Sequence, residues 1–134
     1  VLRPSEMVRE ILVRPMKPDE IGFFRKVGLR GAHAISLASV AAWLKRGRSD
    51  SVFTDARIAL GAVGPTVMRA ESSEVLVKEA PLTKDRLSLI ADKAASECTP
   101  IGDVRATAAY RRAIVAALVY QGLSEILAER QTNW

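Results

Sequence analysis

Apolar residues gather in three short segments of the first half of the chain, at residues 23–29, 35–44 and 56–60. In the third segment, apolar positions alternate with Arg57 and Ala59, which is the two-residue period of a half-buried β-strand. Turn-forming residues separate the segments. The pattern therefore predicts three consecutive strands that form an antiparallel meander.

The second half of the chain has the three- and four-residue apolar spacing of amphipathic helices. A short helix is predicted to start at Ser72 and to run to about Lys78, because Pro81 breaks the pattern soon after. Thr83 is typical of an N-cap residue, and the apolar positions after it predict a second helix that reaches Cys98.

The third predicted helix is the longest, because residues 103–130 contain no proline. Asp103 or Thr107 is its expected N-cap residue. Its centre, residues 113–120, is apolar on all sides, so we expect it to be covered by the sheet and by the preceding helix or a partner. Strands followed by helices predict an α+β fold with an antiparallel sheet of three to four strands packed against three helices.

A length of 134 residues and a mass of 14.6 kDa suit a single hydrophobic core. We expect one domain, with the sheet in residues 19–70 and the helices in residues 71–130. Residues 1–18 are expected to form an entering linker or an edge strand, because prolines flank the apolar segment of residues 7–13.

The charged residues and the single cysteine suggest where the protein works. Lys and Arg outnumber Asp and Glu by 20 to 15, which gives a net charge of +5. One cysteine cannot form an internal disulfide, so a reducing compartment, the cytoplasm, is predicted. The longest apolar run, residues 113–120, is far shorter than the ~20 residues of a membrane span, which argues against membrane insertion. Val1 in place of Met indicates a processed or excised piece.

The candidate reactive residues are few. One His and one Cys exclude a zinc site or an iron–sulfur cluster built from this chain alone, so no bound metal is expected. His33 is interpreted as a solvated turn residue rather than a general base, and Cys98 as a core residue rather than a reactive thiol. Gly61 and Gly64 lack the accompanying glycine or lysine of a nucleotide-binding loop. They are interpreted as a turn with positive φ, the alternative being close approach of the backbone to a ligand or a neighbouring domain.

Basic residues gather in three parts of the chain, which raises the alternative of a nucleic-acid binder whose affinity falls steeply with salt. Solvated charge is the favoured interpretation, because the chain has only two Trp, two Tyr and three Phe for stacking on bases. The three groups are Arg25, Lys26 and Arg30; Lys45, Arg46 and Arg48; and Arg105, Arg111 and Arg112.

A charged group at the entrance of the last helix predicts a structural anchor. It consists of Asp103 and Arg105, with Tyr110 and Arg111 about one turn inside the helix. Charge-assisted hydrogen bonds among such residues can lock a loop.

Three segments carry longer motifs. Residues 55–70 are similar to DARIALGGVAPTPxRA, residues 100–112 to PIxDVRGSAEYRR, and residues 24–40 to FxKxGxRxAxDIAxVSVA. These motifs, in this order, resemble the flavoprotein subunit of molybdenum hydroxylases, the family of carbon monoxide dehydrogenase and xanthine dehydrogenase. The resemblance extends from about residue 2 to residue 127 and corresponds to the C-terminal domain of that subunit.

The resemblance implies a role in electron transfer. Such enzymes oxidise a substrate at a molybdopterin centre and pass electrons through 2Fe–2S clusters to FAD, which reduces an acceptor. The implied partners are an N-terminal FAD-binding domain, a molybdopterin subunit and an iron–sulfur subunit, with no nucleic acid. The chain would complete the flavin site and dock to the partner subunits without a catalytic residue of its own. The resemblance places Lys26 where family members have a lysine that contacts FAD, and Arg30 on the adjoining loop is carried over with it.

The sequence departs from the family motifs at four positions. Ala34 replaces an aspartate, Ala62 a glycine, Gly64 an alanine and Ala109 a glutamate. The change at position 34 removes a polar group beside the implied FAD contact. The alternative function is a noncatalytic protein-interaction module that keeps the fold without touching a flavin.

Overall fold

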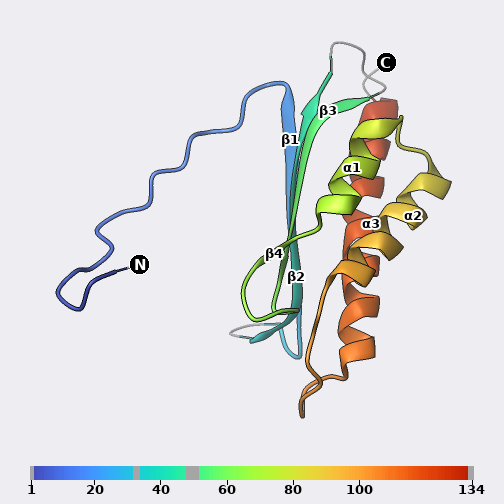
Figure 1. Cartoon of the computed structure of the whole chain (residues 1–134). Coiled ribbons are helices and arrows are strands. Elements are labelled where there is room, and N and C mark those ends of the chain that lie inside the picture. Colours follow the sequence, from blue (N-terminus) through green and yellow to red (C-terminus); the bar gives the residue numbers. More distant parts are fainter. Residues whose placement is uncertain (1, 32–33, 48–51, 133–134) are drawn as a thin grey trace.

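The computed structural model describes residues 2–31, 34–47 and 52–132. Strands precede helices along the chain, and one antiparallel sheet in the order β1-β2-β3-β4 packs against helices on a single face (Figure 1). This arrangement confirms the predicted α+β fold. The elements are β1 (Glu20–Gly28), β2 (Ser36–Arg46), β3 (Phe53–Gly61), β4 (Met68–Arg69), α1 (Glu71–Glu79), α2 (Lys84–Glu97) and α3 (Ala108–Thr132).

The first three strands confirm the predicted meander, but they extend further toward the β2–β3 turn than the sequence pattern indicated. Glu20 pairs with Lys45, and Arg46 pairs with Phe53. Charged residues continue these strands because their backbone groups still find ladder partners at the sheet end. The two residues of β4 pair with the end of β3. A strand of two residues is too short to show the alternation of apolar and polar residues by which strands are predicted.

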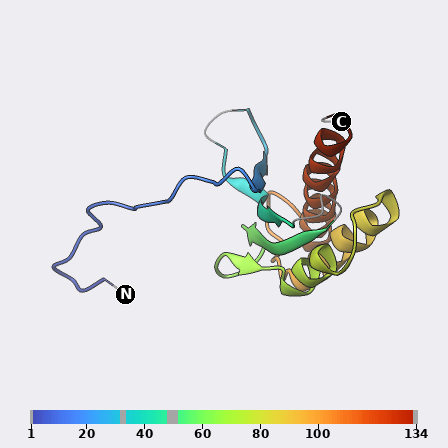
Figure 2. The same ribbon diagram turned by 90° about the horizontal axis from the view of Figure 1, so that it is seen from above.

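The two faces of the sheet differ in what covers them. Toward the helices, Val40, Ile58 and Leu60 are completely buried and form the centre of the core. Viewed along the strands, the helices form one layer on that side (Figure 2). The opposite face carries exposed Phe24 and Lys26, so it is an open face within the described structure.

The helices start where side chains satisfy their first backbone amides. Thr83 Oγ1 accepts from the amide of Arg86 at 3.3 Å, which confirms the predicted cap of α2. Thr107 Oγ1 accepts from the amide of Tyr110 at 3.1 Å and caps α3. α1 starts at Glu71, one residue before the predicted position. Its cap is the distant carboxylate of Glu97, which accepts from the amide of Ser72 at 2.8 Å, so no local motif marks this start.

The centre of α3 is only partly covered. Val115 and Val119 are completely buried, as predicted for a face against the sheet and α2. The sheet and α2 cover this helix as expected, while Ala113, Ala117 and Tyr120 are exposed on its other side. Two of the three uncovered residues are alanines, whose exposure costs little. None of the described helices has both the length and the apolar character that crossing a membrane requires.

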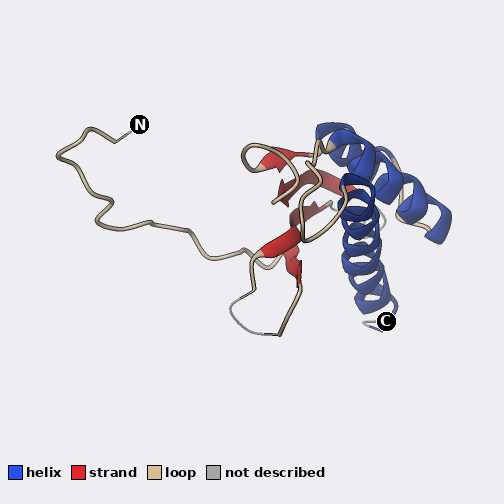
Figure 3. Ribbon diagram, turned by 90° about the horizontal axis from the view of Figure 1, so that it is seen from below, coloured by secondary structure: helices blue, strands red, loops and turns tan. Residues whose placement is uncertain are grey.

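Residues 6–17 form neither a helix nor a strand and run away from the helix layer (Figure 3). Because these described residues contain no strand, residues 6–17 are called the linker. The linker is tied down at its end by Arg14, whose two guanidinium nitrogens donate to the carboxylate of Glu20 at 2.7 and 2.8 Å.

Candidate functional site

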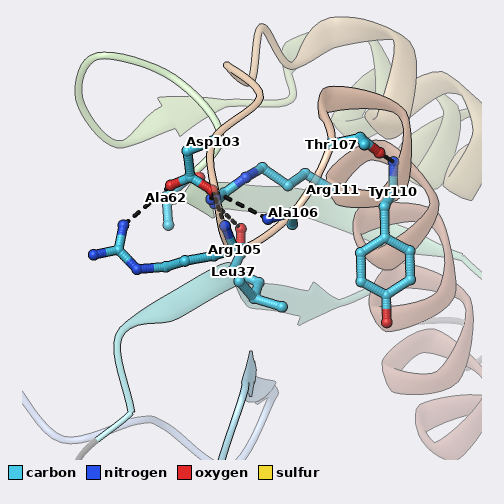
Figure 4. Close-up of polar contacts among 8 residues, drawn as sticks. All are labelled: Leu37, Ala62, Asp103, Arg105, Ala106, Thr107, Tyr110 and Arg111. Atoms are coloured by element: carbon cyan, nitrogen blue, oxygen red, sulfur yellow. Dashed lines mark hydrogen bonds and ion pairs between the residues drawn. The ribbon is translucent and has the colours of Figure 1, made fainter.

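Three loops meet at the end of the sheet where β1 and β3 finish, and their described residues are 29–31 with 34–35, 62–67 and 98–107. The side chain of Arg111, 5% exposed, reaches from α3 into this junction. It donates to the carbonyl oxygen of Leu37 at 2.7 Å, to that of Ala62 at 3.3 Å and to Asp103 Oδ1 at 2.9 Å (Figure 4). One guanidinium group therefore connects the start of β2, the β3–β4 loop and the α2–α3 loop.

Asp103 is the anionic centre of this junction. Its Oδ1 accepts from the amides of Arg105 and Ala106 at 2.9 and 3.1 Å, and its Oδ2 accepts from Arg105 Nη1 at 3.0 Å. The amide of Arg105 and the guanidinium of Arg111 lower the pKa of Asp103 to about 2. The carboxylate thus stays charged and holds the α2–α3 loop in a turn just before α3.

The structure brings three of the four residues of the predicted anchor together: Asp103, Arg105 and Arg111. Tyr110 lies outside the cluster, because its ring is 55% exposed and points away from Asp103 (Figure 4). Tyr110 and Arg111 are adjacent in sequence and therefore lie about 100° apart around the helix, which separates their side chains.

The β3–β4 loop differs from the predicted turn in one backbone angle. The residue with positive φ is Ala62, at 61°, whereas neither Gly61 nor Gly64 has a positive φ. These glycines serve a steric purpose: a Cβ on Gly61 would overlap Ser39 Oγ at 2.5 Å, and one on Gly64 would overlap the sulfur of Met68. Close approach of this loop to a ligand or a neighbouring domain stays a prediction.

Lys26 lies near the end of β1 on the open face of the sheet. Its Nζ donates to the carbonyl oxygen of Ala34 at 3.2 Å and has no carboxylate partner among the described residues. A pocket of about 470 Å³ opens beside it. The pocket is lined by Lys26, Val27, Gly28, Leu29, Arg30, Gly31 and Ala34, which brings the two predicted FAD-contact residues to one place. His33 lies outside the described residues.

Small side chains adjoin Lys26 across the open face. Lys26 pairs with Ser39, and Ser39 pairs in turn with Gly61. In the next row Ala41 and Ala59 occupy the corresponding positions beside Phe24. Because neighbouring strands are about 4.8 Å apart, these residues leave a flat area that a planar group or a flat protein surface can contact.

Cys98 is 1% exposed and forms part of the core, as predicted. Burial raises the pKa of its thiol, and the Sγ lies 3.2 Å from the carbonyl oxygen of Ala95. Both features oppose formation of a reactive thiolate.

Comparison with known proteins identifies the family to which this fold belongs. The family model of the CO dehydrogenase flavoprotein C-terminal domain matches residues 23–126. The chain therefore belongs to the family of CO dehydrogenase flavoprotein C-terminal domains. No curated protein sequence matches it.

Solved structures show the same fold. A carbon monoxide dehydrogenase from Hydrogenophaga pseudoflava, in a form that lacks the Mo-pyranopterin moiety of its molybdenum cofactor, is 28% identical with a TM-score of 0.75. The match covers 84% of this chain and 38% of that one. Reconstituted CO dehydrogenase from Oligotropha carboxidovorans is 22% identical, with a TM-score of 0.72 and coverage of 82% and 38%.

A third similar structure is quinoline 2-oxidoreductase from Pseudomonas putida 86, at 20% identity and a TM-score of 0.71. It matches 81% of this chain and 37% of its own. The chain thus corresponds to well under half the length of each of these relatives.

Proposed function

We propose that this chain is the C-terminal domain of the FAD-binding subunit of a molybdenum-dependent hydroxylase, where it completes the flavin site and docks to partner subunits. The family match and the similarity to a carbon monoxide dehydrogenase support the class of protein. The FAD of such an enzyme transfers electrons from iron–sulfur clusters to an acceptor. This chain's own residues would bind and orient the flavin.

The position of Lys26 is the observation that carries this proposal. Its ammonium group has three donors, and its hydrogen bond to Ala34 within the described structure leaves two for a ligand. The pocket beside it and the flat area of small residues provide space for a planar ring system. These features fit a flavin whose oxygen atoms accept from Lys26 while its ring lies along the open face.

The junction around Arg111 is proposed to position Lys26 indirectly. Arg111 donates to the carbonyl oxygen of Leu37 at the start of β2. Ala34 precedes Leu37 by three residues, and its carbonyl oxygen accepts from Lys26. Fixing both ends of the β1–β2 connection limits where the ammonium group can lie. Arg111 and Asp103 are therefore positioning residues, and neither touches the proposed flavin.

The test is to replace Lys26 in the native assembly. We expect Lys26→Ala to weaken FAD binding about tenfold or more, because one charge-assisted hydrogen bond is lost. The matched control is Lys84→Ala, since Lys84 is an exposed lysine at the start of α2, on the helix side. The measured quantity is the FAD retained per chain after purification and dilution. Equal retention in the two variants would contradict the flavin contact.

A protein-interaction module without flavin contact is the competing function. It predicts an assembly that holds this chain and its partners and whose FAD content does not change when Lys26 is replaced. The comparison of Lys26→Ala with Lys84→Ala therefore separates the two functions.

A further inference from the structure

The entering linker carries an unusual concentration of exposed apolar side chains. Met7, Ile11, Leu12 and Val13 are between 81% and 86% exposed, and Val8 is 61% exposed. Single exposed apolar residues are common, but a consecutive group of this size marks an interaction site. The backbone of residues 7–13 makes no hydrogen bond to any other described residue, so its donors and acceptors are also available.

The sequence of this segment suits a β-strand. Residues 7, 9, 11 and 13 would share one face, and three of these four, Met7, Ile11 and Val13, are apolar. The other face alternates apolar with charged residues and includes Glu10. Arg9 lies on the first face and Glu10 on the second, so each face carries one charged residue between apolar ones, which suits an edge strand with charged side chains in solvent.

The segment is joined to the body at a fixed point. The carboxylate of Glu20, 3% exposed, accepts from both ends of the Arg14 guanidinium and from the amide of Lys17 at 3.0 Å. The hydrogen bonds from Arg14 are the main reason that the pKa of Glu20 is lowered to about 2, and the amide of Lys17 adds to the effect. The Glu20 carboxylate is therefore charged at neutral pH. Residues 7–13 therefore extend from a defined position beside β1.

That position directs the segment toward the open face. A cleft of about 410 Å³ lies where the segment meets the sheet, and it is lined by Val13, Arg14, Met16, Trp43 and Arg57. Trp43 and Arg57 pair across β2 and β3 and continue the face that carries Phe24 and Lys26. A domain that packs on the open face would thus also contact residues 7–13.

We propose that residues 7–13 form a strand that adds to the edge of a β-sheet in the FAD-binding domain that covers the open face. This inference rests on the proposed function, in which a domain that holds FAD packs on the open face. The matched region covers only 37–38% of the similar structures, so those chains contain further structure beside this domain. Main-chain hydrogen bonds would supply affinity, and Met7, Ile11 and Val13 would enter the partner's core.

The test compares hydrogen exchange of residues 7–13 in the isolated chain and in the native flavin-containing assembly. In the isolated chain these amides are expected to exchange at the rate of an unstructured peptide. In the assembly, exchange is expected to slow about 100-fold or more at alternate residues, as in an edge strand. Exchange that is equally fast in an assembly containing FAD would overturn the inference and leave the proposed function standing. An assembly without FAD would instead contradict the proposed function, and it would also exclude the FAD-binding domain as the partner of residues 7–13.

A pair of variants tests the two faces of the strand. Ile11→Asp is expected to reduce recovery of the FAD-binding domain about tenfold or more, whereas Glu10→Gln on the other face retains it. Both residues lie outside the core, so the isolated variants should keep the melting temperature of the unmodified chain. If the isolated chain instead forms a dimer that Ile11→Asp returns to a monomer, residues 7–13 pair with a second copy and the inference is overturned.

Discussion

The guanidinium of Arg111 donates to the carbonyl oxygen of Ala62. Among the described residues other than glycine, Ala62 is the one with a left-handed backbone, at φ 61°. A buried side chain on the last helix thus holds a strained residue between β3 and β4. An alanine in this conformation costs about 1–2 kcal/mol relative to a residue without a Cβ. The family motif has glycine at this position, so the strain is a property of this sequence.

Ala62→Gly is predicted to stabilise the fold. Relief of the left-handed strain outweighs the extra entropy of glycine in the unfolded chain, so we expect a gain of about 0.5–1 kcal/mol in the free energy of unfolding. The matched control is Ala113→Gly at an exposed position of α3, where the same change should cost about 1 kcal/mol. Urea unfolding measures both. A loss of stability in Ala62→Gly would show that residue 62 is not left-handed.

Arg111→Lys is predicted to destabilise the fold by about 2–3 kcal/mol. An ammonium group lacks the planar fork that serves two carbonyl oxygens and Asp103 together, so buried acceptors lose their donor. The neighbouring Arg112 is exposed, and Arg112→Lys should change stability by less than about 0.5 kcal/mol. Equal unfolding midpoints for the two variants would contradict the proposed role of Arg111.

Acid is predicted to weaken the junction through Asp103. Its pKa of about 2 in the folded protein lies below its ordinary value of 3.8, so its contribution to stability is complete above pH 4. That contribution is lost as the pH falls toward 2. Asp103→Asn should therefore melt at a lower temperature than the unmodified chain at pH 7, and the difference should shrink by pH 3. Asp92→Asn, at an exposed position of α2, is the control for removal of a carboxylate. A difference at Asp103 that is constant with pH would contradict the account.

Gly122 allows α3 to approach the sheet closely, because a Cβ at this position would overlap the ring of Phe23. Gly122→Ala is predicted to cost about 1 kcal/mol, since the overlap exceeds the gain in helix propensity. In a Phe23→Leu background the overlap is removed, and the same change should stabilise by up to about 1 kcal/mol. A double-mutant cycle measures this reversal of sign, and additive effects would show that the two residues do not touch.

The fold could be predicted from the sequence where a local signal exists. The alternation at residues 56–60 and the cap at Thr83 both correspond to elements of the structure. The start of α1 was predicted to within one residue, but its cap was not, because Glu97, more than 20 residues away along the chain, supplies it. The positive φ was assigned to the wrong residues of the β3–β4 loop, because glycine permits that conformation without requiring it.

The candidate site was predictable only through the family motifs. Nothing in composition or period distinguishes Lys26 from the other lysines, and the pocket beside it depends on long-range strand pairing. The junction of Asp103 and Arg111 was visible as a charge pattern, but its carbonyl partners at Leu37 and Ala62 come from distant loops. Such contacts follow from topology, which local spacing does not encode.

The central claim, that this chain completes a flavin site in a molybdenum-dependent hydroxylase, is tested most directly by a visible absorption spectrum of the native assembly. The assembly is purified through a tag on this chain, and the protein composition of the same sample is determined. The account predicts absorption bands of flavin and of iron–sulfur clusters, together with partner polypeptides. A colourless sample that contains this chain alone would contradict the flavin function and leave only the fold.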